Sequence, residues 1–196
     1  MRQLVLASNN PHKIAEIRAI LSDLPFEILA GTDFPSFPDP DETGATLEEN
    51  ARLKAVAVQH ATGLWALADD SGLEVDALDG APGVVSARFA GPQCSFADNN
   101  RKLLAVMEQV PDERRGAKFR SVAALARSST DVLLFAGEIA GMILREPRGE
   151  GGFGYDPVFW VPELGCTFAE ATADAKNRLS HRARAFRQVA EYLRTA

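Results

Sequence analysis

The chain has 196 residues, and its 21 lysines and arginines against 27 aspartates and glutamates leave a formal net charge of −6 at pH 7. This length suits one domain with a core of its own, and a charged fraction of 24% excludes a mainly disordered, fibrous or coiled-coil protein. The negative balance, without a polybasic stretch, predicts no nucleic-acid partner, and at first it also argues against any polyanionic ligand.

The sequence also disfavours membrane-spanning and secreted proteins. Its most apolar run, residues 132–144, is broken by Gly137, Glu138 and Gly141, and it falls short of the roughly 18 apolar residues that a membrane helix requires. The first ten residues turn polar too early for a secretory signal, and the two cysteines lie in no metal-binding or redox pattern. We therefore expect a cytoplasmic protein that makes no membrane contact.

Hydrophobic periodicity predicts strands and helices in alternation along the chain. The expected strands cover residues 2–7, 26–30, 65–68, 117–127, 131–145 and 157–161, and the expected helices cover 11–22, 46–61, 95–110 and 180 onward. Repeated prolines among acidic residues predict a loop over 32–44, and the two longest strands are expected to form an antiparallel hairpin. With no internal repeat, residues 1–196 are predicted to form one α/β domain.

The first polar cluster stands where the first strand meets the first helix. Asn10 followed by Pro11 predicts a capped helix start, where unpaired N–H groups and the positive end of the helix dipole suit a phosphate. Lys13 in the first turn opposes that dipole, which hints at a ligand, although a capped helix with a solvated lysine explains the pattern equally well. The candidate phosphate segment is Ser8, Asn9, Asn10, Pro11, His12 and Lys13.

Two acidic clusters follow. Glu42 ends the proline-rich loop and Lys54 lies on the next helix, so the two could bind a metal–phosphate pair, although a solvated acidic surface explains them more simply. Asp69 and Asp70 come directly after an apolar strand, which we expect to end there. Adjacent carboxylates repel each other, and a bound Mg²⁺ would favour ionisation of both, so we prefer a metal site to a solvated turn.

The fourth cluster combines a glycine-rich loop with a helix start. Residues 151–157 allow a ligand to approach the backbone closely, and Phe153 or Tyr155 could stack on a base. His181 and Arg182 are two potential cations at the start of the last helix, where they oppose its dipole. Each motif is weak when taken alone, because a flexible turn and a surface helix end contain the same residue types.

Taken together, the clusters resemble one enzyme family. Their order and spacing are similar to those of the inosine/xanthosine triphosphate pyrophosphatases, which remove non-standard purine nucleotides, and the resemblance extends from residue 3 to about 193. The segments that carry it are ASNNPHK from residue 7, DETGATLEENARLKA from 41, ADDSGLEVDALDGAPGVVSARFAG from 68, GGFGYDPVF from 151 and KNRLSHR from 176.

The resemblance implies a fold and a reaction. The fold would be α/β, with an elongated mixed central sheet flanked by helices and two lobes with the active-site cleft between them. The reaction would be hydrolysis of ITP, dITP or XTP to the monophosphate and pyrophosphate, with Mg²⁺ as the cofactor. The resemblance also implies a homodimer.

The resemblance assigns roles to individual residues. Asp70 matches the proton acceptor and a metal ligand, Glu42 matches the second metal-associated acid, and Asp69 supports them. The other matches would bind substrate: Ser8, Asn9, Asn10, Pro11, His12 and Lys13 the phosphates, Phe153, Gly154, Tyr155 and Asp156 the base and sugar, and Ser71, Lys54, Lys176, His181 and Arg182 further groups. The first motif departs from the family's frequent Thr-Gly-Asn, which could alter triphosphate affinity.

The choice of base is expected to depend on the group at purine position 6. Arg182 or a backbone N–H would donate to the 6-keto oxygen of hypoxanthine or xanthine, whereas adenine presents an amino donor there.

The sequence leaves other functions open. A pyrophosphatase for modified pyrimidine nucleotides, a nucleotide-binding sensor without turnover, and a non-catalytic interaction domain are the alternatives. Glu42, Asp69 and Asp70 count against the sensor, because a pure anion binder gains nothing from carboxylates.

Overall fold

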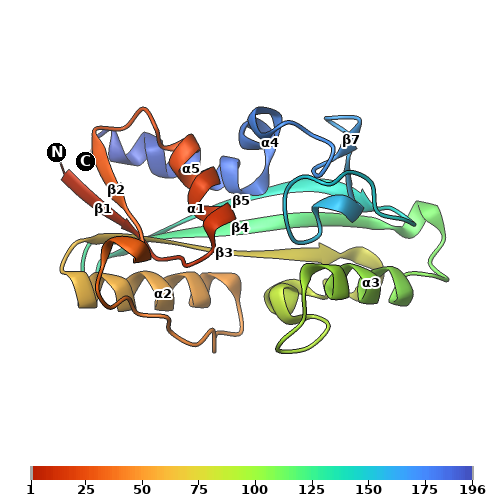
Figure 1. The fold of residues 1–196 in the computed structure, drawn as a ribbon, viewed down its shortest axis with the longest axis horizontal. Helices are drawn as coiled ribbons and strands as arrows, with labels where there is room; N and C mark the ends of the chain where they lie inside the picture. The colour runs from red at the N-terminus through yellow and green to blue at the C-terminus, as the bar shows by residue number, and fades with distance from the viewer. Residues whose placement is uncertain (1, 196) are drawn as a thin grey trace. The chain divides into compact units, whose positions relative to one another are not determined.

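A computed structural model describes residues 2–195, which form a mixed α/β fold (Figure 1). The strands are β1 (Arg2–Leu6), β2 (Phe26–Leu29), β3 (Trp65–Val75), β4 (Gly116–Ala126), β5 (Val132–Ile143), β6 (Phe159–Val161) and β7 (Cys166–Thr167). The helices are α1 (Pro11–Ile20), α2 (Leu47–Thr62), α3 (Phe96–Val106), α4 (Ala173–Leu179) and α5 (His181–Leu193). None of the helices in residues 2–195 is long and apolar enough to cross a membrane.

The strands form one sheet in the order β2-β1-β3-β4-β5-β6-β7. Strand β1 pairs in parallel with β2 and β3, while β6 pairs antiparallel with β5 and β7, so the sheet is mixed as predicted. Strands β4 and β5 are neighbours, and their connection is closed by a hydrogen bond from the Arg127 N–H to the Asp131 carbonyl oxygen.

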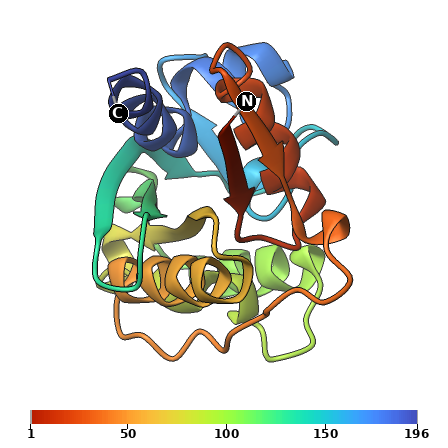
Figure 2. The ribbon, with the colours of Figure 1, turned by 90° about the vertical axis from the view of Figure 1, so that its left-hand side faces the viewer.

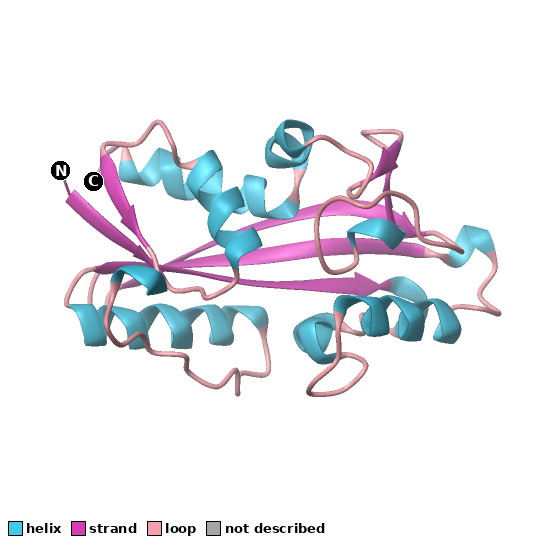
Figure 3. Ribbon diagram, in the orientation of Figure 1, coloured by secondary structure: helices cyan, strands magenta, loops and turns pink. Residues whose placement is uncertain are grey.

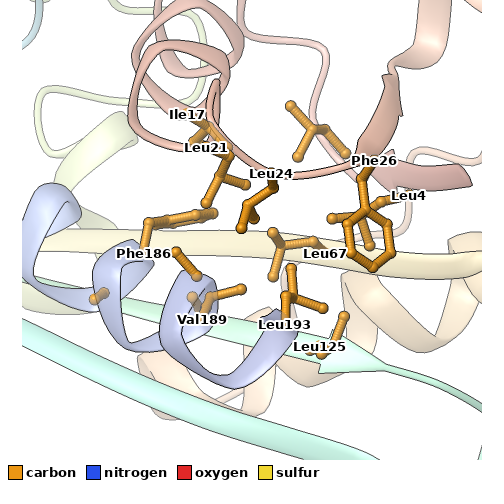
Figure 4. Close-up of a cluster of buried hydrophobic side chains, with 14 residues drawn as sticks. Leu4, Ile17, Leu21, Leu24, Phe26, Leu67, Leu125, Phe186, Val189 and Leu193 are labelled. Carbon is orange, nitrogen blue, oxygen red and sulfur yellow. The ribbon is translucent and has the colours of Figure 1, made fainter. Parts of the chain in front are cut away.

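The chain divides into two compact units, and the first contains residues 1–70, 121–137 and 181–196. Helix α2 covers one face of this unit's strands, and α1 and α5 cover the other (Figures 1 and 2). Ile17 of α1, Leu67 of β3 and Phe186 of α5 meet in its core (Figure 4). The apolar positions of α5 recur at helical spacing because they face this core.

The second unit contains residues 71–120 and 138–180. Its core joins Leu73 of β3, Leu103 of α3 and Phe159 of β6. Helix α3 lies on one face of this unit's strands and α4 on the other (Figure 3). The glycine-rich loop of the sequence analysis belongs to this unit.

The prediction that the third strand ends before Asp69 was wrong, because β3 continues to Val75. The strand continues because Leu73 and Val75 are fully buried and because both aspartates find cationic partners within the fold. Gly72 is required in mid-strand, since a Cβ there would lie 2.5 Å from the Gly83 carbonyl oxygen. The aspartates are therefore held by a rigid strand and not by a solvated turn.

Helix α4 was not predicted from the sequence. Thr172 caps it by accepting a hydrogen bond from the Ala175 N–H at 3.2 Å. The extended backbone of Ser180, with ψ of 159°, separates α4 from α5. The C-terminal part of the chain therefore contains two helices where the sequence analysis placed one.

Candidate active site

The start of α1 is closed by its own side chains. Asn10 Oδ1 accepts hydrogen bonds from the N–H groups of His12 and Lys13 at 3.0 and 3.3 Å, and Ser8 Oγ accepts one from the Asn10 N–H at 3.2 Å. These bonds, with Pro11 in the first turn, confirm the predicted capped helix start. A phosphate that takes the amide groups of His12 and Lys13 must displace the Asn10 side chain.

Asp69 is the centre of a buried ion-pair network. Its Oδ2 lies 2.9 Å from Lys13 Nζ and 3.1 Å from Arg182 Nη2, and its Oδ1 accepts a hydrogen bond from Ser121 Oγ at 2.5 Å. Arg182 also pairs with Glu16 through Nη1 at 2.5 Å. Burial would raise the pKa of Asp69, but Arg182 and Lys13 outweigh it and hold that pKa well below its usual value. Asp69 therefore stays ionised and fixes both cations.

Asp70 and Glu42 share one lysine. Lys54 Nζ lies 2.6 Å from Asp70 Oδ1 and 2.9 Å from Glu42 Oε1, and it also donates to the Asp69 carbonyl oxygen at 2.9 Å. Burial would lower the pKa of Lys54, but Asp70 and Glu42 outweigh it and raise that pKa. Burial raises the pKa of Asp70 more than the charge of Lys54 lowers it, and the Glu42 carboxylate raises it further.

The second carboxylate oxygen of Asp70 is unusual. Among residues 2–195, nothing donates a hydrogen bond to Asp70 Oδ2, although this atom is buried. Buried polar atoms are nearly always paired, so an unpaired one calls for a ligand or a chemical role. A carboxylate that has a raised pKa and one buried oxygen without a hydrogen bond is suited to accept a proton or to bind a metal ion.

The carboxylates around Asp70 could hold a divalent metal ion. Mg²⁺ commonly takes one or two carboxylates and fills its other positions with water and phosphate oxygens. Glu42 and Asp70 already converge on one cation, the Lys54 ammonium group. In the described part of the chain, no group of three or more histidine, cysteine, aspartate or glutamate side chains could hold a metal ion by itself. Two carboxylates together with a phosphate ligand would suit Mg²⁺ here.

The loop that carries Glu42 is tied to α2 at two points. Asn50 Oδ1 accepts a hydrogen bond from the Gly44 N–H at 2.7 Å, and Lys54, one turn further along the helix, pairs with Glu42 itself. At the start of α2, Thr46 Oγ1 accepts a hydrogen bond from the Glu49 N–H, and the Glu49 carboxylate accepts one from the Ala45 N–H.

In the second unit, Asp156 organises the glycine-rich loop. Its Oδ2 accepts hydrogen bonds from the Phe153 N–H at 2.8 Å and from Lys176 Nζ at 2.5 Å. Lys176 Nζ also lies 4.7 Å from the centre of the Phe153 ring, which is a cation–π distance. Lys176 is only 5% exposed, and in this arrangement its ammonium group pairs with Asp156 and lies over the Phe153 ring.

The two aromatic residues of the loop differ in their surroundings. The Tyr155 hydroxyl donates to the Ser86 carbonyl oxygen at 2.8 Å, and its ring packs in the core of the second unit. Burial raises the pKa of Tyr155, so its hydroxyl keeps its proton. Phe153 is only half-buried. It is therefore the aromatic side chain of this loop that can contact a base without unpacking the core.

The remaining predicted site residues differ in how far they are exposed. His181 is buried at the start of α5, where Gly137 of β5 leaves room, because a Cβ on Gly137 would meet the His181 carbonyl oxygen. Ser71 is half-buried beside Asp70, and Gly154 has a positive φ of 64°. Asn9, Pro11 and His12 are exposed.

Two residues of the Asp69 network were not predicted from the sequence. Glu16 follows Lys13 by three residues on α1, so helical spacing alone was a signal that could have found it. Ser121 lies 52 residues from Asp69 in an apolar strand, and no local pattern marks it. Both residues belong to the first unit, which also brings together Lys13, Glu42, Lys54, Asp69, Asp70 and Arg182.

The sequence profile of the Ham1 family matches residues 4–192. The chain belongs to the Ham1 family. This Ham1 protein is 52% identical to a dITP/XTP pyrophosphatase of Geobacter sulfurreducens, over 98% of this chain and 97% of that one. It is 46% identical to a dITP/XTP pyrophosphatase of Yersinia pseudotuberculosis over the full length of both.

Solved Ham1 structures have the same fold. The HAM1 protein of Coxiella burnetii superposes with a TM-score of 0.91 at 44% identity, and the match covers all of both chains. The Ham1 protein of Staphylococcus aureus gives 0.87 at 38% identity over 99% of each chain. These matches confirm the predicted family and the predicted α/β fold with a mixed sheet.

Proposed function

We propose that this chain hydrolyses ITP, dITP and XTP to the monophosphate and pyrophosphate, and so removes non-standard purine nucleotides. The observation that carries the proposal is Asp70, a buried carboxylate of raised pKa with one oxygen held by Lys54 and the other without a hydrogen bond. Full-length relatives named dITP/XTP pyrophosphatase support the substrate class.

Asp70 is the proposed proton acceptor. Its unpaired Oδ2 would orient the attacking water and take a proton from it, while the bond from Lys54 to Oδ1 fixes the carboxylate plane. A raised pKa makes this carboxylate a stronger base than an ordinary aspartate. Asp69 supports this arrangement, because the backbone carbonyl of the same residue binds Lys54.

Glu42 and Asp70 would hold the metal ion, for which we propose Mg²⁺. When bound, Mg²⁺ would neutralise phosphate charge and make pyrophosphate a better leaving group. Lys54 would then exchange Glu42 for a phosphate oxygen while it keeps its bond to Asp70 Oδ1, and Lys13 would add a second positive charge beside it. The other predicted residues of the first unit, Ser8, Asn9, Asn10, Pro11 and His12, would bind the phosphates through the start of α1.

For residues of the second unit we propose contacts with the base and sugar of a nucleotide. Phe153 offers its half-buried ring to the base, and Gly154 and Asp156 shape the backbone around it. Lys176 keeps that loop in place through Asp156, and Ser71 continues β3 directly after Asp70. Tyr155 supports the loop from the core.

We expect Arg182→Ala to lower kcat/KM for ITP and to narrow the preference for ITP over ATP. Three nitrogens of Arg182 donate to Asp69 and Glu16 and the residue is buried, so Arg182 must become accessible before it can bind a purine oxygen. The measurement compares kcat/KM for ITP, XTP and ATP in folded protein, with Arg182→Lys as a charge-conserving control. Equal losses of kcat/KM for all three nucleotides would contradict this prediction. They would mean that Arg182 pairs with its carboxylates and does not distinguish the bases.

One assay tests the proposed function against its alternatives. Pyrophosphate release is measured from ITP, XTP, ATP, GTP and modified pyrimidine triphosphates, with and without Mg²⁺. We expect release from ITP and XTP to depend on Mg²⁺ and to exceed that from ATP and GTP. Preference for the pyrimidine nucleotides would contradict the purine assignment, and binding without any release would indicate a sensor.

We further propose that the protein acts in the cytoplasm as a homodimer without a nucleic-acid partner. The net charge of −6 opposes binding to the extended phosphate backbone of DNA or RNA. Light scattering of the purified chain checks the dimer, since a monomeric mass at the assay concentration would contradict it.

A further inference from the structure

Helix α3 contacts the glycine-rich loop through two residues that are one turn apart. Asn100 Nδ2 donates to the Gly154 carbonyl oxygen at 2.9 Å, and the Phe96 ring centre lies 6.0 Å from that of Phe153. Residues four apart share a helix face, so Phe96 and Asn100 together form a support beneath Phe153 and Gly154.

Asn100 is a poor choice for stability alone. It is 8% exposed, and its Oδ1 is buried without a hydrogen bond from any residue in 2–195. Burying an unpaired acceptor costs at least as much free energy as one neutral hydrogen bond returns. A leucine would fill a similar volume without this cost. What asparagine adds is the bond to the Gly154 carbonyl.

The hydrogen bond from Asn100 restricts the backbone of Gly154, which would otherwise change conformation easily. Its φ of 64° and the φ of 70° at Gly152 lie in the left-handed region, which glycine enters freely, so both residues can leave their conformations easily. Asp156 and Lys176 already hold the Phe153 N–H and ring. Asn100 adds an anchor on the carbonyl of the next residue.

We propose that Asn100 and Phe96 are positioning residues that set the affinity for the purine base. They hold Phe153 and Gly154 in the base-binding shape, so less conformational freedom is lost when the nucleotide binds. The inference rests on the proposed function, because that function assigns Phe153 and Gly154 to the base. Contacts made equally in the ground state and the transition state change KM and leave kcat almost unaltered.

The test compares the wild-type chain with Asn100→Leu, which removes the anchor and the unpaired acceptor together. We expect KM for ITP to rise about fivefold, the scale of one neutral hydrogen bond, with kcat within about twofold of wild type. The dissociation constant of inosine monophosphate, measured by calorimetry, rises by the same factor. The melting temperature is unchanged or higher, because the unpaired buried oxygen is gone.

Two further variants sharpen the test. Phe96→Leu removes the aromatic half of the support, and we expect it to change KM in the same direction. Val106→Ala, at an exposed position of the same helix, is the matched control and leaves KM unchanged.

The possible results separate the inference from the proposed function. An unaltered KM in Asn100→Leu, or a fall in kcat and melting temperature together, overturns the inference and leaves the enzyme assignment standing. If wild type binds inosine monophosphate but releases no pyrophosphate from ITP, the proposed function fails, and the two dissociation constants still decide the inference. If wild type does neither, both fail.

Discussion

Asp70→Asn is expected to lower kcat for pyrophosphate release by about 10²- to 10⁴-fold, the usual contribution of a general base. The amide cannot take a proton from water at Oδ2, and it is a weaker ligand for a cation. The fold should persist, because burial already raises the pKa of Asp70 and Lys54 keeps Glu42 and the Asp69 carbonyl as partners. Steady-state kinetics with ITP and thermal unfolding are the two measurements.

A matched control for this variant lies in the acidic loop. Asp39 is exposed, so Asp39→Asn makes the same chemical change and should leave kcat unaltered. The role assigned to Asp70 would be abandoned if Asp70→Asn turned over ITP at the rate of the control.

The second large effect is expected in stability. Asp69→Asn should lower the free energy of unfolding by about 3–5 kcal/mol at pH 7, because it leaves the cations of Arg182 and Lys13 without their shared buried carboxylate. Urea denaturation measures the loss. Asp112→Asn breaks an exposed ion pair with Arg145 and should cost less than about 1 kcal/mol.

The pH dependence of this difference has a definite sign. The folded pKa of Asp69 is depressed, so its contribution is fully present above the unfolded value of about 3.9 and is lost as the pH falls toward the folded value. The difference in the free energy of unfolding between wild type and Asp69→Asn should therefore be constant from pH 7 to about 5 and become smaller below about 4. A gap that narrowed already between pH 7 and 6 would mean that Asp69 is not held ionised by its partners.

The net charge of −6 was a poor guide to the ligand. Asp69 forms ion pairs with Lys13 and Arg182, and Asp70 and Glu42 both pair with Lys54. The acidic residues near the site are therefore neutralised by cations. The Mg²⁺ site that we propose for these carboxylates would suit one triphosphate that arrives with its metal. The total charge still opposes nucleic acid, which requires an extended basic surface.

Local patterns predicted much of the secondary structure. Asn10 before Pro11 marked the start of α1, and Thr46 marked the start of α2, because a helix cap depends only on residues within one turn of it. The spacing of apolar residues identified α5, since its face repeats every turn against one core. The pair Asp69-Asp70 misled the strand prediction because its neutralising partners are remote in sequence.

The sequence by itself determined the family, the succession of strands and helices, and the residue types of the candidate site. Only the tertiary structure decided which of these residues are partners: Lys176 is buried against Asp156, Tyr155 packs in a core, and Ser121 and Asn100 hold site residues from distant segments. The physical reason is burial. Whether a charged or polar group is a ligand, a base or a structural partner depends on the groups that compensate its lost hydration. Here these groups lie up to 166 residues away, as Glu16 does from Arg182.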